Sequence, residues 1–535
     1  MNGGLPRLLC GPWQCSGCRE ERRTVYAEAL RRSARYRTSH ARGALPGSDG
    51  RNAGARRDTV RRARGASAPR PARAVPCVPR TTLHDAAWRP AADTRRAQRD
   101  PCEVCKVTET IGCLIFGALL IFMGLIGSSL KRLPLSAAMV YLGIGFLVGP
   151  AGTGFLSLKL PDDVTNLRIA AEIGLLISLF AIGLRLRVPP ADPRWMLPLR
   201  LGVVAMIFTV ASIAALGVLV LNLNLGVAVL LGAMIAPTDP VLAHDVGVRD
   251  AGDVELVRFS LSAEGGINDG TAYPCAVLGM LLCGSGTTSA LHWSMVGGIA
   301  WGIASGAGAG WLLGFVTARL VAFLRSRHSQ ALGLEGFFAL GLIMLSYGVA
   351  LAIHGYGFLA VFAAGVAMRR VEHRTSGQKT SKETVGVVNS EDVEATATDP
   401  DKAHAFVAES VMGFTIELEH IVEAVLILLI GALVSRYWAD MLTWAGAAVV
   451  ATLLFVIRPA ATQLALIGSR ASHHQRRLIS WFGIRGVGSL YYLMLAIEQE
   501  PRAQLLPMVP WVLAIIAVSI VLHGISAAPL MRRYA

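Results

Sequence analysis

Residues 232–240 read Gly-Ala-Met-Ile-Ala-Pro-Thr-Asp-Pro, within an apolar run that extends to residue 243. Two prolines flank Thr238 and Asp239. Each proline removes a backbone hydrogen-bond donor, and Pro240 also disfavours helical geometry at Asp239, so we expect the helix to break here. A break at membrane depth leaves free carbonyls and helix ends around a cavity, as in many ion sites of transporters. A structural kink is the alternative, but it does not explain a buried Asp.

The composition of the whole chain predicts that this break lies in a membrane. Of the 535 residues, 53% are hydrophobic and only 16% are charged, and the mean hydropathy is +0.50. In soluble proteins, about a quarter of all residues are charged. The sequence therefore predicts an all-α integral membrane protein, because lipid leaves only helices and closed barrels, and barrels lack such long apolar runs.

Thirteen apolar runs are candidate membrane spans, although the ninth is short and interrupted by glycine, so twelve is the alternative. They cover residues 110–129, 135–155, 167–184, 197–220, 224–243, 256–283, 290–318, 332–353, 356–368, 417–435, 441–464, 478–497 and 508–530. With the N-terminus outside, the inner loops carry 22 Lys and Arg residues and the outer loops carry 4. This bias predicts a protein of the inner membrane with a cytoplasmic C-terminus.

Residues 1–106 differ in composition from the remainder. Residues 1–100 hold 22 basic and 8 acidic residues, whereas the other 435 hold 29 and 28, so +14 of the formal charge of +15 belongs to this segment. Nucleic-acid binding by the remainder has no support. The segment is predicted to be disordered, and an over-extended gene start, with the true start near Val104 or Val107, is the alternative. Its two CxxC pairs lack the further ligands of a zinc site, and no cofactor is expected.

The remaining chain divides at one long polar insertion. Residues 371–405 have mixed charges and no periodicity, which is typical of a flexible cytoplasmic loop. A plain linker and a regulatory segment are the two interpretations of this loop. The insertion separates a first transmembrane region, 107–370, from a second, 406–535.

A second polar run lies in the sixth candidate span. Residues 262–271 read Ser-Ala-Glu-Gly-Gly-Ile-Asn-Asp-Gly-Thr. Glu264 and Asp269 do not share a helix face, since five residues turn about 140° past a full turn, so we expect them to have different partners. A carboxylate in a low-dielectric cavity binds a proton near neutral pH, and its oxygens suit hard cations. Asp269 is therefore predicted to exchange a proton for a cation while Asn268 orients it; a structural hydrogen-bond cluster is the alternative.

Two arginines also lie within late apolar runs, Arg458 in Phe-Val-Ile-Arg-Pro and Arg485 in Gly-Ile-Arg-Gly-Val-Gly-Ser. Each needs an anion or a set of carbonyls, and Glu264 and Asp239 are the available anions. The glycines around Arg485 predict a second helix interruption. Paired interruptions in the two halves of a chain indicate an inverted-repeat transporter.

Three runs, APTDP at 236–240, EGGINDG at 264–270 and GIRGVGSLYY at 483–492, follow one another in this order. Together they closely resemble the monovalent cation:proton antiporters of the NhaP/Na⁺–H⁺ exchanger branch, over about residues 109–533. The resemblance implies a fold of thirteen helices, built as an inverted repeat with two crossed broken helices. It also implies a homodimer in the lipid bilayer.

The resemblance further implies roles for single residues. It implies that Asp269 binds ion and proton in competition, and that Thr238 and Asp239 lie at the crossover and contribute ligands to the cation. Asn268 before Asp269 places the chain in the electroneutral branch. Cation and proton are thus the expected transported partners.

The same resemblance assigns the buried charges to structure. Glu264 matches a family Glu that pairs with an arginine, and Arg458 is the match we favour; Arg485 matches the arginine of the second broken helix. Two departures leave the ion preference open. Gly265 stands where many members have a serine ligand, and the third span lacks the acid that some members carry, so Ser262, Ser178 or a water would take that place.

These observations predict a secondary transporter, not an enzyme, which exchanges Na⁺ or Li⁺ for H⁺ by alternating access. A K⁺/H⁺ antiporter is the first alternative and a passive cation channel the second. An intramembrane hydrolase would need paired catalytic aspartates, a Ser/His pair or an HExxH motif, and the sequence contains none of these arrangements.

Overall fold

The computed structural model describes residues 136–239, 242, 246–248, 253–285, 293–328, 333–377, 379–386, 393–499 and 502–534, together with scattered positions from 110 to 125. The predicted disordered segment 1–106 and half of the first candidate span lie outside these residues. The chain divides into two compact units, Met1–Ile115 and Phe116–Ala535. All the helices named below belong to the second unit.

The described part of this unit is all-helical, which confirms the predicted fold class. Its first half contains α3 (Ala137–Val148), α4 (Val164–Arg185), α5 (Met196–Leu199), α6 (Met206–Leu219), α7 (Leu225–Ile235), α8 (Leu256–Ser285), α9 (Trp293–His328), α10 (Glu335–Ala352) and α11 (Gly357–Ser376). Its second half contains α12 (Ser381–Val385), α13 (Val393–Thr398), α14 (Ala403–Met441), α15 (Trp444–Thr452), α16 (Arg458–Ala465), α17 (His473–Trp481), α18 (Val487–Gln499), α19 (Arg502–Leu505) and α20 (Val509–Tyr534).

Helices of the structure lie in each of the second to thirteenth predicted spans, and a π-helical segment joins α5 to α6 (Arg200–Ala205) and α15 to α16 (Leu453–Ile457). Within the described residues, seven helical segments are long and apolar enough to cross a membrane, and α3 and α7 are shorter apolar helices. Large apolar side chains such as Leu219, Phe337 and Trp444 are exposed on the outside of the bundle, which suits contact with lipid. The total of thirteen spans stays a prediction.

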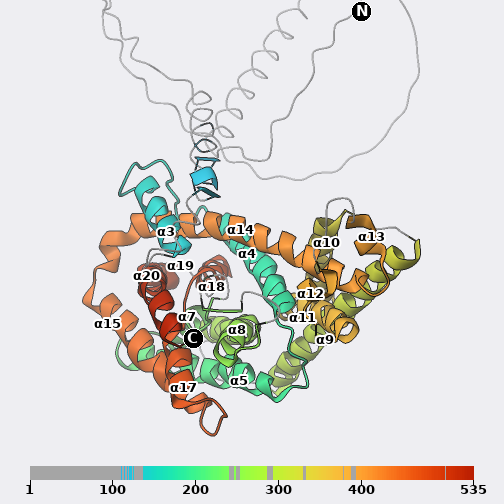
Figure 1. Cartoon of the computed structure of the whole chain (residues 1–535). Coiled ribbons are helices and arrows are strands. Elements are labelled where there is room, and N and C mark those ends of the chain that lie inside the picture. The colour runs from blue at the N-terminus through green and yellow to red at the C-terminus, as the bar shows by residue number, and fades with distance from the viewer. Residues whose placement is uncertain are drawn as a thin grey trace, which may run out of the picture. The chain divides into compact units, whose positions relative to one another are not determined.

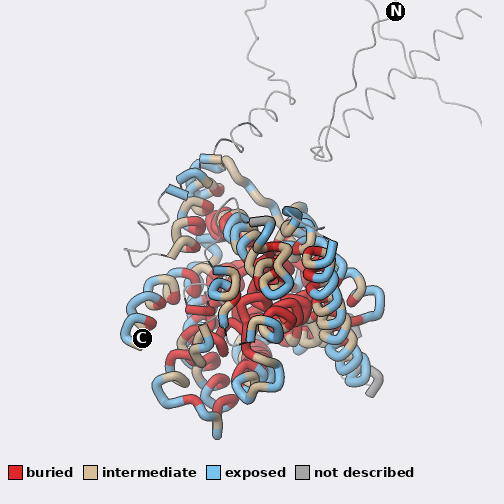
Figure 2. Tube along the Cα trace, turned by 45° about the vertical axis from the view of Figure 1, so that its right-hand side comes forward, coloured by how far each residue is buried: buried red, intermediate tan, exposed pale blue. Residues whose placement is uncertain are grey.

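Helices α7, α8 and α18 lie at the centre of the bundle (Figure 1), where the buried residues concentrate (Figure 2). α7 packs against α8 and α6, and α18 packs against α4 and α7. Residues 226–235 of α7 and 487–497 of α18 are all buried. The centre is therefore lined by helices that reach neither lipid nor water along these stretches.

Both predicted helix interruptions are present, and they meet. α7 ends at Ile235, before the Pro-Thr-Asp run, and α17 and α18 are separated by residues 482–486. The backbone N–H of Asp239 donates to the carbonyl of Ile484 at 2.7 Å. One broken segment thus uses a backbone group of the other, and the crossed broken helices of the predicted fold are confirmed.

The polar insertion contains more structure than its sequence predicts. α11 continues to Ser376, α14 begins at Ala403, and the short helices α12 and α13 lie between them. Thr380 and Glu383 form a reciprocal capping box that starts α12. Polar contacts, not an apolar helix face, hold this segment in place. Its sequence therefore shows no hydrophobic periodicity from which the helices could be predicted. Its predicted flexibility stays a prediction.

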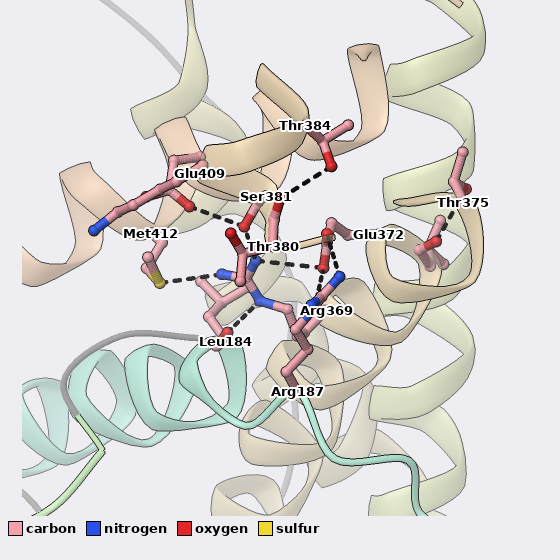
Figure 3. Close-up of polar contacts among 12 residues, drawn as sticks. Leu184, Arg187, Arg369, Glu372, Thr375, Thr380, Ser381, Thr384, Glu409 and Met412 are labelled. Carbon is pink, nitrogen blue, oxygen red and sulfur yellow. Dashed lines mark hydrogen bonds and ion pairs between the residues drawn. The ribbon is translucent and has the colours of Figure 1, made fainter. Parts of the chain in front are cut away.

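Figure 3 shows the polar contacts that hold α12. Arg369 of α11, which is fully buried, donates to the carbonyl of Leu184 at 2.5 Å and to the hydroxyl of Ser381 at 2.9 Å. Ser381 in turn donates to Glu409 of α14 at 3.0 Å. Ser381 therefore binds the insertion to α11 and α14, and Arg369 also joins α11 to the end of α4.

Candidate functional site

Asp239 links the two broken helices through its side chain as well as its backbone. Its side chain is almost fully buried, and Oδ2 accepts a hydrogen bond from the backbone N–H of Val487, the first residue of α18. The first turn of a helix has unpaired N–H groups and a partial positive charge, which favour a carboxylate. Asp239 therefore caps α18 across the crossing point.

Thr238 and Asn268 join the interruption after α7 to α8. The side-chain amide of Asn268 donates to the hydroxyl of Thr238 at 2.6 Å, and both residues are buried. The amide oxygen of Asn268 has no hydrogen-bond partner in the described part of the chain. This arrangement holds Asn268 in one orientation and leaves a neutral oxygen acceptor inside the bundle.

Asp269 lies against the start of α18. Its side chain is 0% exposed, and neither carboxylate oxygen has a hydrogen-bond partner among the described residues. A Cβ added to Gly488 would lie 3.1 Å from Oδ1 of Asp269, and Tyr492 donates to the backbone carbonyl of Asp269 at 2.6 Å. A buried carboxylate without protein donors is costly as a free anion. Bound proton or bound cation removes that cost.

The four residues predicted for ion binding therefore gather around the first turn of α18. Val487 contacts Asp239 and the next residue, Gly488, lies beside Asp269. A small cavity, with room for about one water molecule, is lined by Thr238, Asp239, Val246, Leu261, Phe482 and Ile484. Carboxylate, hydroxyl and amide oxygens are ligands that hard cations prefer. Thr238 and Asp239 bring a hydroxyl and a carboxylate to this cavity, and Asn268 and Asp269 lie outside its lining.

Glu264 and Arg458 form a buried ion pair between α8 and α16. Nη1 and Nη2 of Arg458 lie 2.5 and 2.9 Å from the two carboxylate oxygens of Glu264, a bidentate geometry. Arg458 also donates to the carbonyls of Ile479 and Phe482 at 3.4 and 3.3 Å. This pair therefore connects α8 to the end of α17, next to the second interruption.

Arg485 departs from the expectation that each buried arginine has an anion or carbonyls. Its side chain is 0% exposed, and its three guanidinium nitrogens have no hydrogen-bond partner among the described residues. Its backbone N–H donates to the hydroxyl of Ser519 at 2.9 Å. The carboxylate of Asp239, which the sequence offered as an anion, is bound to Val487.

Two residues of α20 support the second interruption and were missed from the sequence. Ser519 accepts from the N–H of Arg485, and Nε2 of His523 lies 2.9 Å from the carbonyl of Trp481, the last residue of α17. A broken helix frees such backbone groups, and in lipid they need internal partners. The signal was a pair of polar residues four apart in an apolar run, which places both on one helix face.

The two serines considered as substitute ligands have other contacts. The hydroxyl of Ser178 donates to Glu419 of α14 at 2.8 Å, and Ser262 accepts from the backbone N–H of Val248 at 2.9 Å. Glu419 also pairs with Arg185 at 2.5 Å. The third span therefore carries a hydroxyl that is bound to an acid on a different helix.

Comparisons with known proteins show the family and the fold of the chain. Residues 117–533 match the family model described as sodium/hydrogen exchanger, transmembrane. The chain is 27% identical over 415 residues to a K⁺/H⁺ antiporter NhaP of Alkalimonas amylolytica, covering 75% of this chain and 63% of that protein. It is 30% identical over 282 residues to Na⁺/H⁺ antiporter 2 of Zygosaccharomyces rouxii, covering 50% and 33%. The chain thus spans less than two thirds of the length of either relative.

Solved structures share the fold. The sodium proton antiporter MjNhaP1 from Methanocaldococcus jannaschii at pH 8 superposes with a TM-score of 0.58 at 19% identity, covering 80% of this chain and 99% of that one. Its structure from electron microscopy gives 0.59 at 19% identity, covering 79% and 97%. The family match covers most of the chain, and the apolar helices agree with it. This multi-pass membrane protein therefore belongs to the sodium/hydrogen exchanger family.

Proposed function

We propose that the protein is a secondary active antiporter that exchanges Na⁺, or Li⁺, for H⁺ by alternating access, with Asp269 as the residue that binds either ion. The observation that carries this proposal is the fully buried carboxylate of Asp269, whose oxygens have no hydrogen-bond partner among the described residues. Membership of an exchanger family supports it.

Coupling follows from the cost of a buried charge. Moving an ionised carboxylate out of water costs several kcal/mol even after relaxation. A bound proton and a bound monovalent cation each neutralise the single negative charge of Asp269 and so remove this cost. The carboxylate with neither ion bound still carries it. The loaded forms can therefore cross between the two sides and the empty form is held back. One charge exchanged for one charge makes the cycle electroneutral.

The neighbours of Asp269 have separate roles in this proposal. Asn268 offers its amide oxygen to the cation and is oriented by Thr238. Asp239 keeps the first turn of α18 beside the site and adds negative potential. The arrangement needs no bound cofactor. We further propose that the C-terminus is cytoplasmic, as the Lys/Arg bias indicates, and that the protein is a homodimer, as the resemblance implies.

A K⁺/H⁺ exchanger is the second candidate, because one relative bears that name. In this chain Ser178 and Ser262 are bound to other groups, and Gly265 has no ligand atom in a side chain. A site with fewer fixed ligands discriminates less between cations of different size. Comparing Na⁺, Li⁺ and K⁺ in one assay separates the two candidates.

The competition between proton and cation is the direct test. In everted vesicles or proteoliposomes, we expect the apparent KM for the preferred cation to rise about tenfold for each pH unit of acidification, once the carboxylate is mostly protonated. The maximal rate at saturating cation should stay nearly constant. A KM that does not change with pH, together with a falling maximal rate, would show that proton and cation use different sites. Insensitivity of the rate to an imposed membrane potential tests electroneutrality.

Gly486→Ala should strongly reduce exchange. A Cβ at this position would overlap with the side chains of Leu242 and Asp239, so the crossing must shift and Val487 moves away from the carboxylate that caps it. We expect at least a tenfold loss of rate, measured in vesicles at matched protein amount. Gly348→Ala in α10 is the control, because no atom lies within 4 Å of the added Cβ, and its rate should stay within about twofold. Equal rates for both variants would contradict the packing argument.

A further inference from the structure

A polar network ties the far end of α18 to α4. Arg168 of α4 lies 2.5 Å from Glu498 of α18 and 2.6 Å from Glu172 of its own helix. Thr165 donates to the second oxygen of Glu498 at 2.8 Å, and Tyr347 of α10 donates to Glu172. Both carboxylate oxygens of Glu498 are therefore bound by side chains of α4.

This network joins α18, which begins at the candidate ion site, to two helices that contribute no residue to that site. α18 begins at the crossing point, where Val487 and Gly488 touch the two aspartates, and Glu498 lies near its other end. α4 packs against α11 and α14 as well as against α18, and α10 packs against α11 and α14. Any motion that carries the ion site past α4 must break the contact between Arg168 and Glu498, whereas the contact between Glu172 and Tyr347 can stay.

The small cavity at the site lies toward the opposite end of the bundle. Val246 and Leu261, which line it, flank the start of α8. Tyr534 donates to Glu255 just before α8 at 2.5 Å and accepts from Gln475 of α17 at 2.9 Å, so the start of α8 lies beside α17. α18 leads away from α17 toward Glu498. The structure thus has a small cavity near α17 and the start of α8, and it has the polar network of Arg168, Thr165 and Glu498 at the far end of α18.

The exposure of the network suits a contact that opens and closes. Side-chain exposure is 21% for Arg168 and 29% for Glu498, against 4% for Arg458 and 2% for Glu264. Water can reach the first pair and replace the lost partners when it separates, but it cannot reach the second. The ion pair of Arg168 and Glu498 is therefore suited to repeated breakage, and that of Arg458 and Glu264 is not.

We propose that Arg168, Thr165 and Glu498 form a gate that closes the ion site from the side of Glu498, which is the outside under the Lys/Arg bias, and that opens once in each exchange cycle. The gate rests on the proposed antiport function. Glu172 and Tyr347 hold Arg168 in place on the side that does not move.

Cross-linking tests whether the contact must open. Cysteines at Thr165→Cys and Glu498→Cys are joined by a short, reducible thiol reagent, and exchange is measured before linking, after linking and after reduction. We expect linking to lower the rate at least tenfold and reduction to restore it. Glu172→Cys with Tyr347→Cys is the matched pair, whose linking should change its own rate less than twofold. Each variant with only one of the two substitutions, and the unsubstituted chain with its nine native cysteines, control for modification alone. Full exchange by the linked first pair would overturn the gate.

Labelling gives a measure that does not depend on transport. Leu495 lies one turn before Glu498 in α18 and is 7% exposed. A cysteine at Leu495→Cys should react at least tenfold faster with a membrane-impermeant maleimide from the side of Glu498 when Arg168→Ala is also present. Equal labelling rates with and without Arg168→Ala would overturn the gate. If labelling accelerates but no variant exchanges cation for proton, the proposed function fails and the gate stands; if exchange occurs regardless of the link, the reverse holds.

Discussion

Asp269→Asn is expected to abolish cation-dependent proton exchange and to leave the protein folded. Asparagine has nearly the same shape, but it neither takes up a proton nor carries a charge for a cation. The carboxylate oxygens of Asp269 accept no hydrogen bond from described groups, so the substitution removes none. Because burial of an unpaired carboxylate is unfavourable, the melting temperature should stay equal or rise. We expect the rate in everted vesicles to fall by at least about 100-fold, to the level of empty vesicles.

Two further variants make this result specific. Asp162→Asn, at an exposed position before α4, removes the same charge and should leave exchange unchanged. Asp239→Asn keeps an oxygen acceptor for the N–H of Val487, so its rate reports what the second negative charge contributes at the crossing. Full exchange by Asp269→Asn, in protein that melts normally, would exclude Asp269 as the carrier of ion and proton.

Arg458→Ala is expected to cause the largest loss of stability. It leaves the carboxylate of Glu264 buried without its partner and frees the carbonyls of Ile479 and Phe482. Breaking a buried ion pair by removing one partner costs about 3–5 kcal/mol. We therefore expect little folded protein in the membrane, or a clearly lowered melting temperature in detergent. Glu264→Ala should behave alike, because it strands the arginine.

Two comparisons distinguish the effect of breaking the ion pair from the effect of shortening a side chain. Glu264→Leu combined with Arg458→Met removes both charges, and it should recover much of the stability that either alanine variant loses. Arg258→Ala breaks the partly exposed pair with Asp253, 2.9 Å apart, and should cost only about 0–1 kcal/mol. Equal destabilisation by Arg258→Ala and Arg458→Ala would refute the distinction between buried and exposed pairs.

The sequence predicted the parts of this fold that depend on local chemistry. Apolar runs located the helices, and prolines beside Asp239 and glycines around Arg485 located both interruptions, because these residues act on the backbone next to them. The match to the exchanger family confirms the family assigned from three short motifs. The same motifs contain the residues that gather at the start of α18.

The remaining features depend on contacts between distant segments. Ser519 and His523 look like ordinary polar residues of an apolar helix until the freed backbone of α17 lies beside them. Arg168 and Glu498 are 330 residues apart, and neither belongs to a motif. The cap that Asp239 provides for α18 was also invisible, because it requires the register of the two crossed segments. No pattern within one helix encodes these pairings.

The glycines at the start of α18 restrict how this protein can be re-engineered. Gly486 and Gly488 bring bare backbone against Asp239 and Asp269, with no space for a further carbon at the first and little at the second. When the cation preference is to be altered by design, Gly486 and Gly488 therefore cannot be varied. The positions that can be varied are Thr238 and Asn268, whose side chains supply the proposed ligands. Libraries that randomise those two positions should be far richer in active sequences than libraries at the glycines.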